Sequence, residues 1–500
     1  MKVAIIGAGA MGSGIAQVAA AAGEQVQVYD KRAGAAVAAV ASVRILFEQL
    51  AAKGKMPVTA ARAASERLTA AQEFSELAMA ELALEAAVED IATKREIFSA
   101  LDVLVAPTCQ LATNTSSLSL AAIAGALRAP ERLVGMHFFN PAPLMGLVEV
   151  VGSVVTAPAA LEAIERLARA WGKTAVRVRA TPGFIVNRVA RPFYGEGLRL
   201  LAEQATDAAT LDAVLREAGG FRMGPCELTD LIGQDVNFAV TRAVFEAYFG
   251  DPRFQPSLLQ QEMVEAGWLG RKSGRGFFHY GAGAAVPQPS AEPACPAPER
   301  LAIADLPGND ALTDALAARI EGAGIEVMRD PRLPTDVLLR VSDGRTALEL
   351  EIGAGEQPQP TVLVDLARDY ATVTRVAVSA SPLCRGQGWA AAVGALQASG
   401  IAVARVRDLP GLVVLRTAAM LANEAADAVH FGVADAAGVD LAMCKGVNYP
   451  LGPLAWADQI GVARVHSTLA ALACFYGEDR YRTSPLLRQL AWSGGRFYAQ

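Results

Sequence analysis

The chain opens with Lys2-Val-Ala-Ile-Ile6, which runs directly into Gly7-Ala-Gly9-Ala10-Met11-Gly12. The apolar run predicts a short strand, and the glycines let the backbone turn tightly, approach a pyrophosphate and pack the next helix closely. An alanine-rich helix to Ala22 and a second strand at 25–29 complete a β-α-β unit. Phosphates bind at the exposed N–H groups of a helix start. We therefore expect a dinucleotide at Gly7, Gly9, Ala10, Met11 and Gly12.

Asp30 stands at the end of the second predicted strand. Its carboxylate can accept hydrogen bonds from a ribose 2′-hydroxyl and would repel a 2′-phosphate, so we expect NAD rather than NADP. Lys31 and Arg32 follow and could attract such a phosphate. We interpret these two cations as part of a solvated turn.

Strand and helix patterns alternate through the first third of the chain. Such alternation predicts a doubly wound, largely parallel α/β sheet. After Pro182, long helical patterns run to about Tyr280, and a segment rich in proline and glycine follows. The expected strands lie at 82–88, 111–113, 133–138, 146–151 and 174–178, and the expected helices at 93–105, 117–127 and 158–171.

The helical region occurs twice. Pro182-Gly-Phe-Ile-Val-Asn-Arg188 matches Pro410-Gly-Leu-Val-Val-Leu-Arg416, and the same shift of 228 residues places Glu196 on Glu424. This agreement predicts a duplicated helical domain. Between the copies, Leu306-Pro-Gly-Asn-Asp310 keeps one glycine, so we expect a second α/β domain that has lost its nucleotide site. The predicted domains are a nucleotide-binding α/β domain at 1–180, a helical domain at 181–280, a linker at 281–299, a degenerate α/β domain at 300–405 and a second helical domain at 406–500.

The composition excludes several classes of protein. With 52% hydrophobic and 19% charged residues, the chain can bury large cores and is not disordered. A net charge of −6 argues against a nucleic-acid partner. The six cysteines are scattered and form no CxxC pair, which indicates free thiols in a reducing compartment and neither a disulfide frame nor a metal site. No segment looks like a membrane helix, so we expect a cytoplasmic protein without a membrane partner.

His137 and Glu149 form the candidate catalytic pair. His137 ends one predicted strand, Glu149 lies in the next, and Pro141-Ala-Pro143 between them favours a turn. Two short strands joined in this way could bring the carboxylate against the imidazole. A histidine held by a buried carboxylate is a usual arrangement for a general base near neutral pH. A core histidine that merely bonds a nearby acid is the alternative.

A polar run, Ala112-Thr-Asn114-Thr-Ser116-Ser117, follows another predicted strand. Ligands of open α/β sheets bind at the carboxyl ends of the strands, so we expect these side chains at the ligand edge. Capping of the next helix by one of the serines is the alternative, and both can hold at once.

Six motifs in order over residues 1–280 resemble the L-3-hydroxyacyl-CoA dehydrogenase family. This resemblance implies a Rossmann-type NAD domain, an all-α domain, and NAD-dependent oxidation of (S)-3-hydroxyacyl-CoA to 3-oxoacyl-CoA. The motifs are Gly7-Ala-Gly-Ala-Met-Gly12, Glu85-Ala-Ala-Val-Glu89, Ala112-Thr-Asn-Thr-Ser-Ser-Leu118, Gly135-Met-His-Phe-Phe-Asn-Pro141, Leu147-Val-Glu-Val150 and Thr181-Pro-Gly-Phe-Ile-Val-Asn-Arg188.

The resemblance also implies roles for single residues. His137 would remove the proton of the 3-hydroxyl group, and Glu149 would orient the imidazole and stabilise its charged form. Ser116 and Asn187 would hydrogen-bond the substrate oxygen or the thioester carbonyl. The side chains expected beside the cofactor or the reacting end of the substrate are Glu89, Lys94, Asn114 and Asn140.

The substrate itself is less sharply implied. The doubled architecture resembles long bacterial members associated with phenylacetate catabolism, which points to 3-hydroxyadipyl-CoA. A 3-hydroxybutyryl-CoA dehydrogenase of short-chain metabolism would carry the same motifs and stays an alternative, as does an NAD-binding protein without turnover. Lys53 and Lys55 are candidate partners for the phosphates of coenzyme A, although a solvated helix end explains them equally well.

The second half lacks the expected catalytic residues. Asn187 maps onto Leu415, and the segment 376–384, which resembles 134–144, contains no histidine. We therefore expect one active site per chain. In shorter family members two helical domains pair across a dimer interface, so the second copy would supply this partner within one chain, whether or not whole chains form a homo-oligomer.

Overall fold

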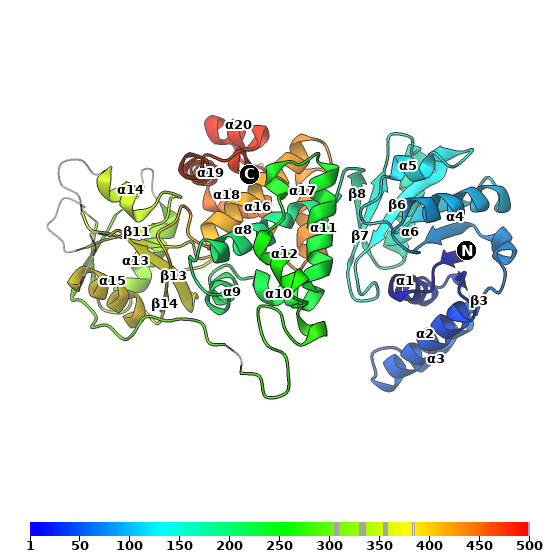
Figure 1. The fold of residues 1–500 in the computed structure, drawn as a ribbon, viewed down its shortest axis with the longest axis horizontal. Coiled ribbons are helices and arrows are strands. Elements are labelled where there is room, and N and C mark those ends of the chain that lie inside the picture. Colours follow the sequence, from blue (N-terminus) through cyan, green and yellow to red (C-terminus); the bar gives the residue numbers. More distant parts are fainter. Residues whose placement is uncertain are drawn as a thin grey trace. The chain divides into compact units, whose positions relative to one another are not determined.

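The computed structural model describes residues 1–285, 287–304, 310–329, 337–353, 359–382, 384 and 386–498. It forms two compact units. Unit 1 contains Met1–Arg188 and Phe431–Val447, and unit 2 contains Val189–His430 and Asn448–Gln500. Each unit has its own sheet, as the ribbon in Figure 1 shows.

The sheet of unit 1 has the strand order β3-β2-β1-β4-β5-β6-β7-β8. All neighbours are parallel except β6 and β7, which are antiparallel. The chain reverses its direction across the sheet between β1 and β4, where open α/β sheets bind their ligands. The strands are β1 (Lys2–Ile6), β2 (Gln25–Tyr29), β3 (Leu68–Ala70), β4 (Leu82–Glu85), β5 (Gln110–Thr113), β6 (Leu133–Phe138), β7 (Leu147–Gly152) and β8 (Thr174–Arg179).

Helices cover both faces of this sheet (Figure 1), and apolar cores fill both layers. The predicted α/β class is confirmed. The expected helix at 117–127 shortens because Ser119, not an earlier serine, caps it by accepting from the Ala122 N–H. The helices are α1 (Ala10–Ala21), α2 (Ala35–Ala52), α3 (Val58–Glu66), α4 (Ile91–Leu104), α5 (Leu120–Ala124), α6 (Pro158–Ala170), α7 (Val186–Val189) and α17 (Ala436–Gly446), with 3₁₀ turns η1 (Phe74–Met79) and η2 (Pro130–Arg132).

Helix α2 overturns one expectation. Its 18 residues have a mean hydropathy of 1.5, so by length and composition alone it could cross a membrane. The expectation that no segment has these properties was wrong, because α2 combines seven alanines with seven larger apolar residues and has only two charged ones. In the structure α2 contacts α1 and α3 and buries Val43 and Phe47, as a helix of an α/β domain does.

Unit 2 contains a smaller sheet with the order β10-β9-β11-β12-β13-β14. Again one neighbouring pair, β12 and β13, is antiparallel. The turn at 305–309, where we expected no nucleotide, lies outside the described residues; Asp310 after it caps α13 and forms an ion pair with Arg464. The strands are β9 (Arg300–Ile303), β10 (Glu326–Met328), β11 (Leu338–Val341), β12 (Thr361–Val364), β13 (Arg375–Ala380) and β14 (Ala402–Arg405).

The helices of unit 2 come from both copies of the helical sequence and from the α/β segment between them. No helix or strand lies among the described residues of 281–299, between α12 and β9. The helices are α8 (Arg191–Ala202), α9 (Ala208–Glu217), α10 (Pro225–Ile232), α11 (Gln234–Ala247), α12 (Leu258–Glu265), α13 (Ala311–Glu321), α14 (Ala347–Ile352), α15 (Gln387–Ala398), α16 (Val414–His430), α18 (Pro453–Ile460), α19 (Val462–Tyr476) and α20 (Pro485–Ser493), with η3 (Pro252–Phe254), η4 (Arg271–Ser273) and η5 (Asp479–Tyr481).

The sequence repeat extends into the sheets. Shifting β7 by 228 residues gives the bounds of β13, and the same shift places 134–144 on 362–372. The proposed match of 376–384 with 134–144 was therefore wrong, because 376–384 begins in β13 and β13 corresponds to β7. The segment that corresponds to β6 is β12 with the loop after it.

Helices are exchanged between the copies. In unit 1, α17 of the second copy contacts β7 and β8, and Gly446 lies so close to Leu147 and Val186 that a Cβ atom there would approach both to less than 3.0 Å. In unit 2, the corresponding α9 of the first copy contacts β13 of the second sheet. Each sheet therefore depends on a helix from the other copy.

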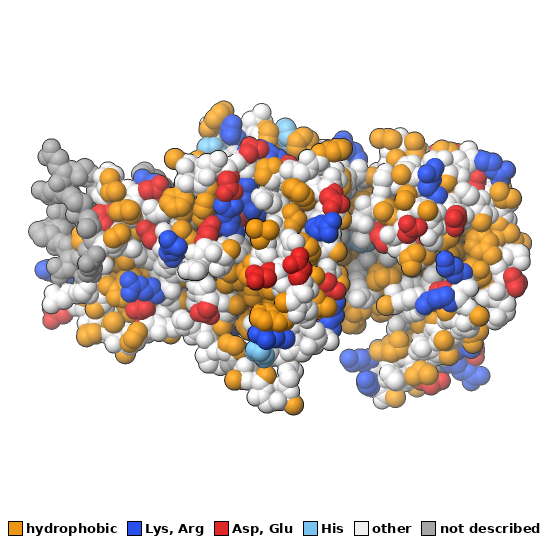
Figure 2. All heavy atoms as spheres, in the orientation of Figure 1, with side chains coloured by type: hydrophobic (Ala, Val, Ile, Leu, Met, Phe, Trp, Pro, Cys, Tyr) orange, Lys and Arg blue, Asp and Glu red, His pale blue; other side chains and the backbone are white. Residues whose placement is uncertain are grey.

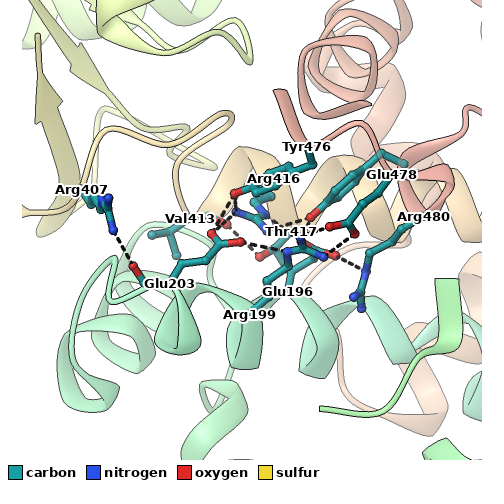
Figure 3. Close-up of polar contacts among 11 residues, drawn as sticks. Glu196, Arg199, Glu203, Arg407, Val413, Arg416, Thr417, Tyr476, Glu478 and Arg480 are labelled. Atoms are coloured by element: carbon teal, nitrogen blue, oxygen red, sulfur yellow. Dashed lines mark hydrogen bonds and ion pairs between the residues drawn. The ribbon is translucent and has the colours of Figure 1, made fainter. Parts of the chain in front are cut away.

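A buried ion pair joins the two copies inside unit 2 (Figure 3). Arg416 of α16 donates from Nε to Glu196 of α8 at 2.7 Å, and the side chains of both residues are fully buried. Arg416 also donates to the hydroxyls of Tyr476 and Tyr481. Burial alone would raise the pKa of Glu196, but the charges of Arg416 and Arg480 hold this pKa below its usual value.

We predict that breaking this pair costs more than replacing it. Arg416→Met leaves Glu196 buried without its main partner and should lower the free energy of unfolding by about 3–5 kcal/mol. Glu196→Gln with Arg416→Met removes both charges and should cost clearly less. Urea unfolding of the two single variants and the double variant measures the coupling. Additive effects of the two substitutions would contradict the prediction.

Candidate active site

The register of unit 1 places His137 directly opposite Glu149, on β6 and β7. The His137 Nδ1 atom lies 2.7 Å from Glu149 Oε2, and both side chains are buried. A carboxylate beside Nδ1 favours the tautomer with the proton on that nitrogen. The second ring nitrogen, Nε2, is then the basic one.

Glu149 also holds the start of α7. Its Oε1 atom accepts hydrogen bonds from the backbone N–H groups of Ile185 and Val186, each at 3.0 Å. One carboxylate therefore orients the imidazole and fixes the backbone directly before Asn187. The rings of Phe139 and Phe184 lie 4.6 Å and 5.7 Å from the imidazole centre and shield it from water.

The second copy shows what replaces this pair. The shift of 228 residues places Asp365 at the position of His137 and Ala377 at that of Glu149. The Asp365 carboxylate accepts from the N–H groups of Val413, Val414 and Leu415, at the start of α16. Burial raises the pKa of Asp365 to about 7. The second copy therefore keeps the contact between a buried carboxylate and a helix start, but it has no imidazole at this position.

The glycine turn after β1 fits a dinucleotide. Gly7 has a φ of 112°, and a Cβ atom on Gly12 would lie 1.8 Å from the Gly7 carbonyl oxygen, so both positions require glycine. Around Gly9, in contrast, a Cβ atom would meet nothing within 4 Å. Gly9 and Ala10 are exposed at the start of α1, and no side chain caps this helix. Its free N–H groups are what a pyrophosphate needs.

Asp30 lies beside this turn, and its carboxylate already accepts hydrogen bonds from the protein. It accepts from the Ala8 N–H at 2.8 Å and from the Arg32 guanidinium through both carboxylate oxygens, at 3.0 Å and 2.9 Å. The hydrogen bonds from Arg32 hold the pKa of Asp30 far below its usual value despite partial burial. Arg32 is exposed, as expected for a turn, but its charge is directed at Asp30. A carboxylate has further lone pairs for ribose hydroxyls.

Glu89 is the centre of the polar loop after β5. Its Oε1 atom accepts from the Thr115 hydroxyl at 2.6 Å and from the N–H groups of Ser116 and Ser117 at 2.9 Å and 3.0 Å. Burial would raise the pKa of Glu89, but Lys94 and these donors hold this pKa below its usual value. The Ser116 hydroxyl makes the longest contact with the same oxygen, at 3.5 Å. Because this hydrogen bond is weak, the hydroxyl can turn toward a ligand.

Lys94 lies behind Glu89. Its side chain is 1% exposed, and Nζ donates to Glu85 at 2.6 Å and approaches Glu89 at 3.2 Å. The lysine therefore positions Glu89 and does not itself reach the surface of the loop. The sequence analysis did not identify Glu85, Thr113 and Thr115 as supports of this loop. The available signal was the apolar run of β4, which ends in Glu85: a glutamate in a buried strand needs hydrogen-bond partners nearby.

The remaining candidate residues have different surroundings. Asn114 Oδ1 accepts from the Phe138 N–H at 2.8 Å and so ties β5 to the end of β6. Asn140 is exposed in the bend after β6, and Asn187 is half-buried in α7. Lys53 and Lys55 are exposed in the turn between α2 and α3. Figure 2 shows Lys and Arg side chains gathered at the tip of this helical hairpin.

Models of three related domains match the chain. The NAD-binding domain of 3-hydroxyacyl-CoA dehydrogenase matches residues 2–181, and the C-terminal domain of the same enzymes matches 183–280 and again 411–496. The reduced Rossmann-fold domain of 3-hydroxybutyryl-CoA dehydrogenase matches 339–410.

Relatives of full and of half length are found. A 3-hydroxyadipyl-CoA dehydrogenase of Escherichia coli is 43% identical over 98% of this chain and 97% of its own. A crystal structure of a 3-hydroxybutyryl-CoA dehydrogenase from Escherichia coli has a TM-score of 0.90 and 40% identity, covering 99% of both chains. A probable 3-hydroxybutyryl-CoA dehydrogenase of Bacillus subtilis is 39% identical over 56% of this chain and 97% of its own. The chain belongs to the 3-hydroxyacyl-CoA dehydrogenase family, and its first domain is the NAD-binding domain of that family.

Proposed function

We propose that His137 is the general base of an NAD-dependent dehydrogenase that oxidises the 3-hydroxyl group of an (S)-3-hydroxyacyl-CoA. The observation that carries this proposal is the 2.7 Å contact between His137 Nδ1 and Glu149 Oε2 on paired strands. With the Nδ1 proton directed at the carboxylate, Nε2 accepts the hydroxyl proton. Glu149 then stabilises the positively charged imidazolium, and the shielding phenyl rings limit competition from water.

The other atoms of the reaction balance in a simple way. The proton of the hydroxyl goes to Nε2, the hydrogen on C3 leaves with its electron pair, and a carbonyl forms at C3. NAD, when bound at the Gly7–Gly12 turn, supplies the acceptor for that hydride. Ser116 and Asn187 are proposed to hydrogen-bond the substrate oxygens, because the loop at Glu89 and the start of α7 position their backbones.

Glu89, Asn114 and Asn140 are proposed to border the cofactor, and Lys94 to act on it through Glu89. Lys53 and Lys55 are proposed to meet the phosphates of coenzyme A, since the protein as a whole is acidic and such an anion needs local cations. A cytoplasmic location is also a proposal, supported by six free cysteines.

3-Hydroxyadipyl-CoA is the proposed substrate, within the degradation of phenylacetate or related aromatic compounds. Its support is the name of the full-length relative in Escherichia coli. 3-Hydroxybutyryl-CoA is the second candidate, because that name belongs to the solved structure of full length and to the relatives of half length. The two helical copies already pair within one chain. We also propose that whole chains can form a homo-oligomer, with either substrate.

We predict that His137→Ala lowers kcat for 3-hydroxyacyl-CoA oxidation by about 10²–10⁴-fold, because it removes the general base. NADH absorbance measures the rate. His279→Ala is the matched control, since this histidine is exposed and belongs to no proposed site. Equal rates of His137→Ala and the parent protein would refute the assignment.

We predict that Asp30→Ser shifts cofactor preference toward NADP. The substitution removes the repelling carboxylate and releases the guanidinium of Arg32 for a 2′-phosphate, so the ratio of kcat/KM for NAD over NADP should fall by about tenfold or more. Arg32→Gln serves as the control, because it keeps Asp30 and should retain the preference for NAD. An unchanged ratio in Asp30→Ser would contradict this role.

We predict a higher kcat/KM for 3-hydroxyadipyl-CoA than for L-3-hydroxybutyryl-CoA, measured side by side at saturating NAD. The two substrates differ at the far end of the acyl chain, where only the first has a carboxylate. A higher value for the four-carbon substrate would decide for the second candidate.

A further inference from the structure

Unit 2 contains a cavity of about 230 Å³ that the proposed chemistry does not use. It lies among α8, α11, η3, the first turn of α12 and η5. Four arginines line it, namely Arg191, Arg199, Arg253 and Arg480. Apolar side chains such as Leu198 and Leu259 form part of its wall.

Three of the four arginines have carboxylate partners. Arg199 binds Glu203 and Glu478, and Arg480 approaches Glu196 at 3.4 Å, as Figure 3 shows. Arg253 forms ion pairs with Glu424 and Asp427. Their charges are therefore compensated within the fold.

Arg191 is different. It is 6% exposed, and within the described parts of the chain no carboxylate lies within ion-pair distance of it. Its Nη1 atom donates to the Thr241 hydroxyl at 3.0 Å and its guanidinium lies over the ring of Tyr194, but its buried Nε atom has no hydrogen-bond partner there. Burial lowers the pKa of Arg191, yet a guanidinium keeps its proton in proteins. A buried charge of this kind is costly unless an anion completes it.

The fold itself does not require this cation. The repeat places Ala419 of α16 at the position of Arg191, and Ala422 at that of Tyr194. The second copy thus builds the same helix without a charge at this point. The buried arginine thus occurs in the first copy and not in the second, as expected of a residue that binds a ligand.

The remaining wall favours an anion. Ser257 to Gln260, the start of α12, line the cavity, and helix starts carry partial positive charge. Four of the five N–H groups of Arg191 make no hydrogen bond within the described chain. A planar guanidinium matches the oxygens of a carboxylate or a phosphate, but the single uncompensated cation here balances the one charge of a carboxylate better than the two charges of a phosphate.

We infer that this cavity is a binding site for the carboxylate of a small aliphatic carboxylic acid, with Arg191 as its ion-pair partner. The leucine side chains would contact the methylene groups. The site takes a free carboxylic acid, and it does not rest on the proposed function.

The first test measures binding without turnover. Calorimetric titration of the full-length protein with adipate, in a phosphate-free buffer of low ionic strength, should show binding that weakens tenfold or more in Arg191→Gln. Arg242→Gln, which removes an exposed arginine of α11 outside the cavity, should bind as the parent does. Adipamide has the same length without charge and should not bind at this site. Binding of inorganic phosphate in preference to adipate would overturn the carboxylate assignment.

The second test uses a variant that keeps the charge, in case Arg191→Gln does not fold. Arg191→Lys lacks the planar fork of the guanidinium and must also weaken adipate binding. The inference is overturned when adipate binding does not depend on Arg191.

Discussion

The site in unit 1 depends on the carboxylate of Glu149. One of its oxygens meets the imidazole of His137 and the other meets two N–H groups at the start of α7. The carboxylate is fully buried, so these hydrogen bonds are its compensation for lost water. Because a one-residue slip of β7 would turn Glu149 to the other face, the register of the sheet and the position of the base are fixed together.

The second copy separates the structural from the chemical part of this arrangement. Asp365 still accepts from the N–H groups at the start of α16, so a buried carboxylate there serves the fold. It does so from the position of His137, while Ala377 replaces the glutamate. A shorter acid in the place of the base thus keeps the helix anchored and cannot orient an imidazole. This exchange agrees with the expectation of one active site per chain.

Much of the arrangement could be predicted from the sequence, for identifiable reasons. The strands β4 to β8 are short apolar runs bounded by turn residues, and the glycine turn has a spacing that few other folds require. The 228-residue repeat identified the duplicated helices because it is free of gaps. In contrast, α3 and β3 were missed, since both are short and short segments carry little periodicity. The hydrogen bonds of Glu89 to the loop after β5 and the ion pairs of Arg416 join segments that are distant in the sequence, so no local pattern reveals them.

The central claim is that the Nε2 atom of His137, oriented by Glu149, takes the proton of the substrate hydroxyl. A crystal structure of the protein with NAD and a slow 3-hydroxyacyl-CoA analogue tests this claim most directly. The account predicts the 3-hydroxyl oxygen within about 2.6–3.2 Å of Nε2, with the contact between Nδ1 and Glu149 retained. A hydroxyl bound out of reach of Nε2, with another side chain as its nearest proton acceptor, would contradict it.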